Sequence, residues 1–596
     1  MGNEWIVEIY CLSITMQKEV YQHISTQTSD PIVERRTCTI TGEEFAIFQS
    51  DLDFYSKFSP SFAGKKYQVP LPEICPEERQ RRRQMFRNER SLYRRICSAS
   101  EKSIISAYSP DKPFKIYDQE IWRSDRWDPL QYGRDFDSSR TFFDQFKDLQ
   151  SDVPHLYLVN INVENSYYTN YALYQKNCYL IFWWANNEDC GYGAFLVGSN
   201  NCIDMHSCTD CEFCYEAVDC VWCYNCYFVK NCKDCSDCIM TQDCINCKHC
   251  IACFGLANQE YCYLNKKYAK EEFKAIEEQY KHLDVTKINS LKEQFTQLAN
   301  NLPHRYAYIY DSENSIGNVV RNSKNTVVAF DAAGNEECKY IFSCPNSLRS
   351  QDCVFTAPEG NQNCYNVCST VGVDTGMGTF LVRYGSHMYY CMECFHCNNC
   401  FGCIGLKNKE YCIFNKQYTR EEYEKLVAQI IEKMQSDWER GLYFEPSLSP
   451  FAYNETVVME YFPLTKEEAL KRWYKRQDQN HDPIIPEWTE TLRWDQIPWD
   501  ISNVTDDVLR KVLVCESSGR PYKLTKQELD FYRKHHLPLP RKHHDIRHQE
   551  RFTQRPERAL HVRKCDKCGQ ELLSVYDEKV GFKVYCEECY NKEIYW

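Results

Sequence analysis

Four cysteines near the C-terminus have the spacing of a metal site. Cys565 and Cys568 form one CxxC pair, Cys586 and Cys589 form a second, and seventeen residues separate the two pairs. This spacing is typical of a zinc ribbon, in which two CxxC turns face each other and bind one tetrahedral Zn2+. Four thiolates leave no open coordination position, so the sequence predicts a structural Zn2+ and not a catalytic one.

A longer motif with one leading cysteine occurs near both ends of the chain. CTITGEEFAIFQSDLDFYSKF begins at Cys38, and CESSGRPYKLTKQELDFYRKH begins at Cys515. A cysteine, a glycine turn, a strand, a helix and a second ligand group are typical of a treble-clef zinc module. Neither copy has a CxxC in the second ligand group, which reads CPEE from Cys75 in the first copy and has His543 and Ile546 in the second. A bound metal and a metal-free module held by its core therefore both stay open. The candidate ligands are Cys38, Cys75 and Cys97 in the first copy and Cys515, His543 and His548 in the second.

The middle of the chain repeats every twelve residues. The main column of the repeat is Ser166, Cys178, Cys190, Cys202, Cys214, Cys226, Cys238, Cys250 and Cys262. Two further columns are Cys208, Cys220, Cys232 and Cys244, and Cys211, Cys223, Cys235 and Cys247. A fixed period this short predicts one small β-solenoid coil per repeat. Asn or Asp often precedes the main column, which suits corners that need a positive φ.

The stacked thiols have three open interpretations. Coils about 4.8 Å apart would bring equivalent sulfurs together on neighbouring rungs. The thiols could be buried packing residues, ligands of metal clusters, or disulfides between rungs, the last being typical of oxidising compartments. We favour packing, because a second copy of the repeat carries Gly376 and Met388 in the main column.

The repeat region itself is duplicated. The segment CFGLANQEYCYLNKKYAKEEF (253–273) recurs as CIGLKNKEYCIFNKQYTREEY (403–423). Helices are expected at about 270–281 and 285–300, and after Thr419. Capping boxes are expected at Thr419 with Glu422, Thr465 with Glu468, and Thr525 with Glu528.

An arginine-rich stretch follows the first module. Its candidate phosphate contacts are Arg79, Arg81, Arg82, Arg83, Arg87 and Arg90. Arginine can grip phosphate with two hydrogen bonds, so RNA or DNA binding is one interpretation. The other is a solvated helix face or pairing with acidic residues of the same chain, whose formal charge is −13.

Composition and end sequences bound the remaining classes. The longest strongly apolar run, about 179–185, is too short to span a membrane. The first residues, MGNEWIVEIYC, lack the basic and apolar regions of a secretory signal. We therefore expect a cytoplasmic protein that does not enter a membrane.

Several blocks together resemble a known family. They are the DLDFY module, RNERSLYRR, SAYSPDKPFKIYD, WDPLQYGRDFD and GLKNKEYCIFNKQYTREEY. They resemble an uncharacterised cysteine-rich protein family of candidate-phylum bacteria, and the resemblance covers most of the chain. It implies zinc-binding terminal modules with a CPxCR motif, whose second cysteine is replaced here by Glu78 and Ile546. It implies no activity.

The expected fold is mainly β with helices: a duplicated cysteine-rich β-solenoid, flanked by small treble-clef-like modules and ended by a zinc ribbon. The expected domains are 1–97 (first module with arginine-rich helix), 98–160 (irregular connection), 161–305 and 306–442 (solenoids with capping helices), 443–510 (Pro- and Trp-rich linker), 511–560 (second module) and 561–596 (zinc ribbon). The sequence shows no phosphate loop, nucleophile elbow or HExxH motif. It therefore predicts a non-enzymatic scaffold with a protein partner and no small-molecule substrate. The rival predictions are a nucleic-acid-binding protein and a thiol-based metal or redox buffer.

Overall fold

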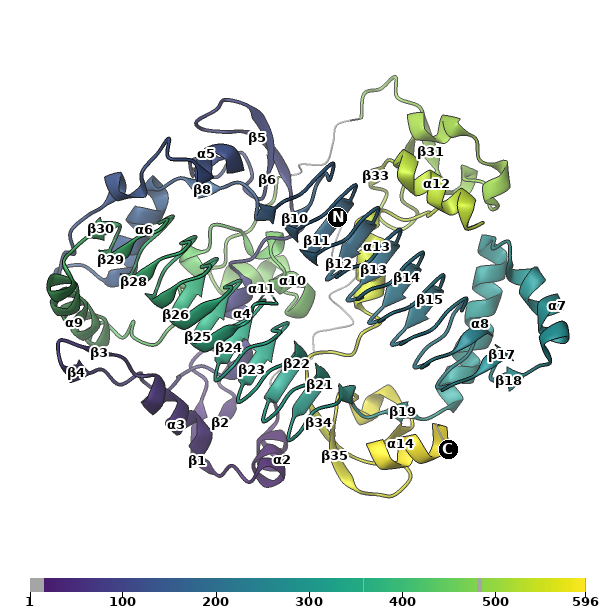
Figure 1. Ribbon diagram of the computed structural model, residues 1–596, viewed down its shortest axis with the longest axis horizontal. Helices are drawn as coiled ribbons and strands as arrows, with labels where there is room; N and C mark the ends of the chain where they lie inside the picture. The colour runs from purple at the N-terminus through teal and green to yellow at the C-terminus, as the bar shows by residue number, and fades with distance from the viewer. Residues whose placement is uncertain (1–15, 357, 480–484, 595–596) are drawn as a thin grey trace.

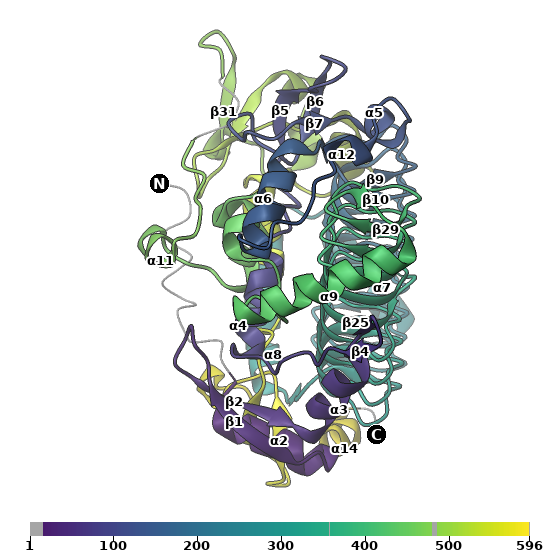
Figure 2. The ribbon, with the colours of Figure 1, turned by 90° about the vertical axis from the view of Figure 1, so that its left-hand side faces the viewer.

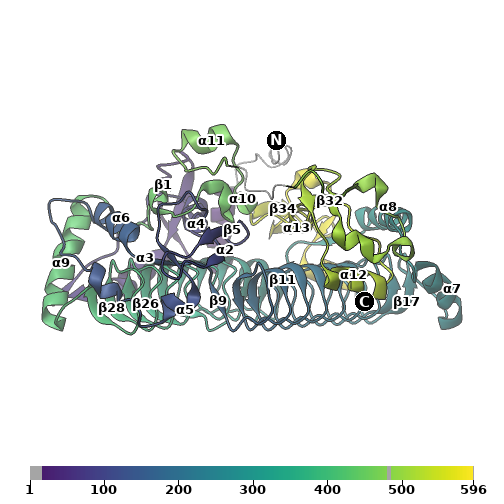
Figure 3. The same cartoon turned by 90° about the horizontal axis from the view of Figure 1, so that it is seen from above.

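The computed structural model describes residues 16–356, 358–479 and 485–594. The protein is mixed α/β, and two long parallel sheets form its largest part. Both sheets begin near the middle of the molecule and extend to opposite ends of its long axis (Figure 1). The smaller elements from both ends of the chain lie together on one side of the two sheets (Figures 2 and 3). No helix in the described part of the chain is long and apolar enough to cross a membrane.

The first sheet has its strands twelve residues apart. Tyr215 pairs with Tyr227 and Ala217 with Val229, both in parallel register. Single bridges continue the pairing into a short three-stranded sheet, and we call both parts together the first sheet. Its strands are β9 (Asn160–Ile161), β10 (Asn170–Leu173), β11 (Tyr179–Ala185), β12 (Gly191–Ala194), β13 (Ile203–His206), β14 (Tyr215–Val218), β15 (Tyr227–Lys230), β16 (Lys248–Ile251), β17 (Glu260–Tyr263) and β18 (Lys266–Lys267).

The second sheet repeats this arrangement with eleven strands. They are β20 (Ile309–Tyr310), β21 (Ile316–Arg321), β22 (Val327–Ala333), β23 (Lys339–Phe342), β24 (Gln351–Val354), β25 (Asn361–Cys368), β26 (Val373–Phe380), β27 (Ser386–Tyr389), β28 (Asn398–Phe401), β29 (Glu410–Ile413) and β30 (Lys416–Gln417). Cys364 pairs with Gly376, Gly376 with Met388 and Met388 with Cys400. The interruption of the cysteine column is therefore confirmed in register.

Left-handed backbone turns occur at every third residue of the first repeat. Asn165, Asn177, Asp189 and Asn201, which precede the main column, have φ between 45° and 53°. The expected corners at these Asn and Asp positions are confirmed. A turn at every third residue accompanies four inward-facing positions in each twelve residues.

The inward positions form a narrow core of small side chains. Three of its columns are the cysteine columns, and Met205, Ala217 and Val229 belong to the fourth. All of the cysteines from Cys178 to Cys262 are buried. A core four side chains wide favours thiols and aliphatic groups without rings, which explains the composition of the repeat.

Helices flank the far end of each sheet. These helices are α7 (Lys270–Tyr280), α8 (Val285–Asn301) and α9 (Arg420–Ser436). All three were expected, and the capping box of Thr419 with Glu422 is present at the start of α9. Phe273 of α7 and Tyr423 of α9 are buried against the last strands, so the helices cover apolar surface that the sheets would otherwise expose.

Residues before the first sheet form small hairpins and helices. They are α2 (Lys18–Thr28), β1 (Ile32–Thr37), β2 (Glu44–Phe48), α3 (Gln49–Phe58), β3 (Ser61–Phe62), β4 (Lys65–Lys66), α4 (Pro76–Gln84), β5 (Tyr93–Ile96), β6 (Ser103–Ser106), β7 (Ile116–Tyr117), α5 (Gln119–Arg123), η2 (Pro129–Tyr132), α6 (Phe142–Asp152) and β8 (His155–Leu156).

Residues after the second sheet complete the fold, together with β19, which lies between the two sheets in the chain. They are β19 (His304–Arg305), η3 (Pro446–Leu448), η4 (Tyr453–Glu455), α10 (Val458–Tyr461), α11 (Lys466–Lys471), β31 (Thr491–Arg493), η5 (Trp494–Gln496), η6 (Ile501–Asn503), η7 (Asp506–Arg510), β32 (Val512–Val514), β33 (Pro521–Tyr522), α12 (Lys526–Lys534), α13 (His544–Phe552), β34 (His561–Lys564), β35 (Glu571–Ser574), η8 (Glu578–Val580), β36 (Val584–Tyr585) and α14 (Glu587–Ile594). The expected capping box of Thr465 with Glu468 is present at α11.

Candidate metal centre

The four C-terminal cysteines come together as the sequence predicts. Their sulfur atoms all lie within 4.8 Å of one another, and the Cys568 and Cys586 sulfurs are 3.8 Å apart. The backbone N–H of Cys586 donates to the Cys565 sulfur at 3.3 Å. Burial raises the pKa of the Cys565 thiol, but backbone N–H groups of Cys568 and Cys586 outweigh this and lower it to about 6. Four sulfurs supported by N–H donors fit a metal ion that binds thiolates.

Backbone hydrogen bonds build the first turn of this site. The N–H of Cys565 donates to the Gln570 carbonyl at 2.8 Å, and the N–H of Gly569 donates to the Cys565 carbonyl at 2.9 Å. Gly569 has φ of +75°, which a glycine adopts without strain. A third bond, from Asp566 N–H to the Val584 carbonyl at 3.0 Å, joins the two cysteine turns. We call this three-bond arrangement a knuckle.

Among the residues that the structure describes, the knuckle occurs three more times, at Cys38, Cys97 and Cys515. The first bonds are Cys38 N–H to Glu43 O at 2.8 Å, Cys97 N–H to Lys102 O at 2.9 Å and Cys515 N–H to Arg520 O at 3.0 Å. The bonds that join the two turns are Thr39 N–H to Glu73 O at 3.1 Å, Ser98 N–H to Ile116 O at 2.8 Å and Glu516 N–H to Arg541 O at 3.1 Å. The residue four places after each cysteine also has a left-handed φ, as Gly569 does.

Only the last knuckle has thiols at all four ligand positions. The equivalent positions are Cys38, Thr41, Cys75 and Glu78 in the first, Cys97, Ser100, Asp118 and Ile121 in the second, and Cys515, Ser518, His543 and Ile546 in the third. Cys97 therefore begins a knuckle of its own, and in the described part of the chain it does not join Cys38 and Cys75 in a shared metal site. The expectation of such a shared site is wrong.

The second knuckle was missed in the sequence, where 98–160 was expected to be irregular. The signal was present, because residues 75–121 align without a gap with residues 543–589. In this alignment Cys97 matches Cys565, and Asp118 matches Cys586. Three of its four ligand positions hold residues other than cysteine, so a search for cysteine pairs does not detect this copy.

The third knuckle does not bring its three predicted ligands together. His548 instead lies 3.0 Å from Glu460. A group that could hold a metal is formed by His543, His544 and Asp545. However, guanidinium groups of Arg90 and Arg520 bind the Asp545 carboxylate, at 3.0 and 2.8 Å. Two fixed positive charges on the only carboxylate disfavour a cation there.

Three arginines in α4 and just after it point into the protein. Arg79 Nε lies 2.7 Å from Asp352 of the second sheet, and Arg83 donates to Asn366 at 2.9 Å. Arg87 donates to Glu89 at 2.5 Å and stacks at 3.7 Å on the Trp183 ring. Arg79, Arg83 and Arg87 are buried, whereas Arg81, Arg82 and Arg90 are half-buried. Three of the six candidate phosphate contacts thus have no access to a nucleic acid, and for Arg79, Arg83 and Arg87 the structure fits the second interpretation, pairing within the chain.

Helix α13 repeats this docking on the first sheet. Arg547 and Arg551 form ion pairs with the buried Asp204, and the Arg551 pair is 2.7 Å long. Arg555 binds Asp219 at 2.8 Å and also contacts Asp331 of the second sheet. Arg547, Arg551 and Arg555 occupy the positions of Arg79, Arg83 and Arg87 in the ungapped alignment. Helix α4 docks on the second sheet, although the first sheet is nearer to it in the chain. Helix α13 docks on the first sheet, although the second sheet is nearer to it in the chain.

Glu528 contributes to the same interface, which corrects one predicted cap. Thr525 accepts the N–H of Glu528 at 3.1 Å, as expected at the start of α12. The Glu528 carboxylate does not return to the helix end but accepts from Tyr192 at 2.6 Å and from Tyr532 at 3.0 Å. The capping box is therefore half formed, because a buried tyrosine of the first sheet takes up the carboxylate.

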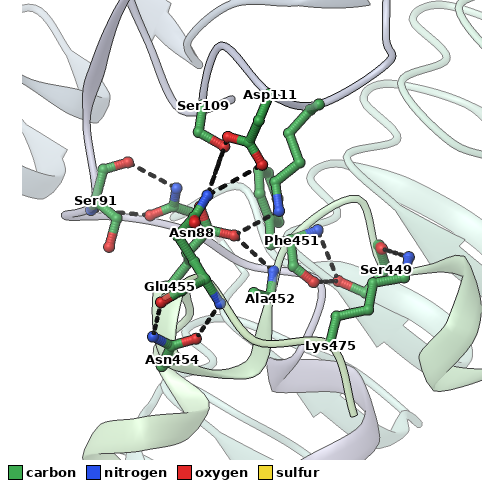
Figure 4. Close-up of polar contacts among 12 residues, drawn as sticks. Asn88, Ser91, Ser109, Asp111, Ser449, Phe451, Ala452, Asn454, Glu455 and Lys475 are labelled. Carbon is green, nitrogen blue, oxygen red and sulfur yellow. Dashed lines mark hydrogen bonds and ion pairs between the residues drawn. The ribbon is translucent and has the colours of Figure 1, made fainter. Parts of the chain in front are cut away.

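The linker is fixed by a polar network (Figure 4). Glu455 accepts from the N–H of Ala452 at 2.6 Å and lies 2.9 Å from Lys112. Lys475 donates to the Ser449 carbonyl at 2.7 Å. The Glu455 carboxylate thus has its hydrogen-bond partners and counter-ion within the chain, which indicates a structural role.

The column thiols act as hydrogen-bond donors. Cys202 donates to the carbonyls of Asn200 at 3.2 Å and Cys211 at 3.4 Å. The same two contacts, to the residues two before and nine after, recur along the columns. Burial raises the pKa of Cys202, and in the second sheet it raises the pKa of Cys338 to about 12. Burial also raises the pKa of Cys208, but hydrogen bonds with Cys211 and Cys220 outweigh this and lower it to about 6, so the direction alternates along the columns. The metal-ligand groups found among the described residues do not include the columns.

Comparisons with known proteins add no relative. A scan against protein-family models found no match, and a search of curated proteins found none either.

Proposed function

We propose that the protein is a non-enzymatic scaffold with an unidentified protein partner. The observation that carries this proposal is the double docking of arginine-bearing helices, α4 on the second sheet and α13 on the first. Buried charges are costly unless they are paired. Here buried arginines of both helices are paired with carboxylates of the two sheets, so their guanidinium groups are not available to a substrate.

We infer that each parallel sheet is one side of a β-solenoid. The twelve-residue register and the turns at every third residue support a coil with four short sides. Buried thiols then serve as core filler, since they are small and satisfy their S–H groups on coil carbonyls. This assignment favours the scaffold over a thiol-based metal buffer, which needs exposed sulfur.

We infer that the knuckles are treble-clef-like modules and that the last one binds structural Zn2+. Four thiolates are a preferred ligand set for Zn2+, which they hold tetrahedrally without an open position. Cys565 and Cys568 lie between β34 and β35, while Cys586 directly follows β36. Strand β36 pairs with β19 at the start of the second sheet. A bound ion would therefore fasten the C-terminal module beside the point where the two sheets are joined.

We also propose that the chain belongs to the cysteine-rich family that its sequence blocks resemble. Membership supports the inference that the modules at both ends of the chain derive from zinc-binding modules. It does not bear on the partner.

The zinc assignment is tested by metal analysis of the purified full chain. We expect one Zn2+ per chain, lost in the double variant Cys568→Ser with Cys586→Ser. The matched control is Cys515→Ser, which changes the equivalent position of an incomplete knuckle and should leave the zinc content unchanged. Metal content that is the same in the double variant as in the wild type would overturn the assignment.

A further inference from the structure

The first knuckle differs from the other incomplete ones, because it holds two thiols. Cys38 and Cys75 occupy the first and third ligand positions. Glu78, at the fourth position, is bound by Arg81 at 2.6 Å and by Arg472 at 3.3 Å. Its carboxylate is therefore not free to complete a metal site. The first knuckle therefore holds the Cys38 and Cys75 thiols in the backbone arrangement that brings four sulfurs together in the metal centre.

The backbone sets the distance between these thiols. In the metal centre, the hydrogen bond that joins the two turns is 3.0 Å long, and the sulfurs of Cys565 and Cys586 lie within 4.8 Å. The equivalent bond in the first knuckle, from Thr39 N–H to the Glu73 carbonyl, is 3.1 Å long. The same backbone arrangement therefore places the Cys38 and Cys75 sulfurs at the positions that the Cys565 and Cys586 sulfurs occupy in the metal centre.

We propose that Cys38 and Cys75 are a redox-active pair that a peroxide converts into an intramolecular disulfide. The Cys38 thiolate attacks one peroxide oxygen, so that an S–O bond forms, the O–O bond breaks and, with one proton taken up, the first water leaves. The Cys75 sulfur then attacks the Cys38 sulfenic acid. An S–S bond forms, the S–O bond breaks, and the thiol proton of Cys75 leaves with the hydroxyl group as the second water. The two thiols lose two electrons, and the peroxide gains them.

The surroundings of the pair suit this reaction. The neighbouring Cys75 thiol is the largest cause that lowers the pKa of the Cys38 thiol, which favours the thiolate form that attacks a peroxide. Cys38 in turn is the largest cause that raises the pKa of Cys75. Cys38 is buried, but Thr37, Thr39 and Gly42 around it are exposed, so only a thin layer separates it from solvent. The column thiols lie inside the repeat and donate to carbonyl oxygens.

The chain supplies matched controls for the pair. Cys97 and Cys515 sit in the same backbone arrangement but have Asp118 and His543 at the third position. They share the turn, the burial and the N–H donors of Cys38, and they lack a partner thiol. The proposal also stands apart from the zinc scaffold, because it concerns sulfurs outside the metal centre.

The experiment is peptide mapping of the full chain after treatment with hydrogen peroxide. Remaining thiols are alkylated, the chain is digested with trypsin, and the products are weighed with and without reduction. We expect peptides 37–57 and 67–79 to be joined and to separate on reduction. Cys38→Ser and Cys75→Ser should abolish this product, and Cys97→Ser should retain it.

The exposed Cys568 reports that the oxidant has acted. If Cys568 is oxidised while peptides 37–57 and 67–79 are recovered separately, with free thiols or with Cys38 as sulfinic acid, the proposal is overturned. The wild-type map alone decides this, so the outcome does not depend on the serine variants folding. Loss of zinc without the joined product likewise counts against the pair and leaves the metal assignment in place.

Discussion

Asp204 is the residue on which the docking of α13 depends most. Its carboxylate is fully buried and faces the guanidinium groups of Arg547 and Arg551. Asp204→Asn keeps the shape but leaves two buried positive charges with less compensation. Breaking a buried ion pair costs about 3–5 kcal/mol. Arg547 retains Glu528 at 3.4 Å, so we expect the lower end, about 3 kcal/mol.

Amide hydrogen exchange is the assay that matches this perturbation, since modules and sheets need not unfold together. A loss of about 3 kcal/mol corresponds to roughly a hundredfold faster exchange in α13. The matched control is Glu188→Gln, which removes an exposed pair with Lys176 at 2.5 Å and should cost less than about 1 kcal/mol. Asp352→Asn should loosen α4 in the same way and leave α13 protected.

Equal exchange rates in the two variants would show that the buried ion pair of Asp204 is not needed for the docking of α13. If Asp204→Asn speeds exchange in α13 no more than Glu188→Gln does, the buried pair does not hold the helix. The double docking would then be packing of apolar surface with incidental charges, and the main support for the scaffold proposal would be lost.

Two further predictions concern the columns and the arginines. Cys223→Ala removes little volume and should lower the free energy of unfolding by about 1 kcal/mol. Cys223→Asp buries an unpaired charge and should lower it by several kcal/mol or prevent folding. Chemical denaturation measures both changes, and equal effects would contradict a thiol core without water. Arg79→Ala with Arg83→Ala should destabilise the chain through the loss of Asp352 pairing and should leave any binding to mixed RNA unchanged, as judged by thermal unfolding beside a gel-shift titration; weaker RNA binding by a variant with unchanged stability would restore the nucleic-acid interpretation.

Local sequence was sufficient for the features that depend on neighbours in the chain. The period of twelve residues predicted the register of the strands, because each strand pairs with the one twelve residues further along the chain. Asn and Asp before the main column predicted left-handed corners, since these residues tolerate positive φ. The CxxC pairs at Cys565 and Cys586 likewise predicted a four-sulfur group, because their spacing suffices to close a hairpin.

Features that depend on distant segments were decided by the tertiary structure. Six arginines between Arg79 and Arg90 read equally well as a phosphate-binding row or as an internal interface. Only the placement of Asp352, far along the chain, decides that Arg79 is buried and paired. The same holds for Glu528, whose local pattern predicts a capping box but whose carboxylate is taken by Tyr192. A charge is satisfied by whichever partner the fold brings within a few ångströms, and sequence spacing carries no information about partners hundreds of residues away.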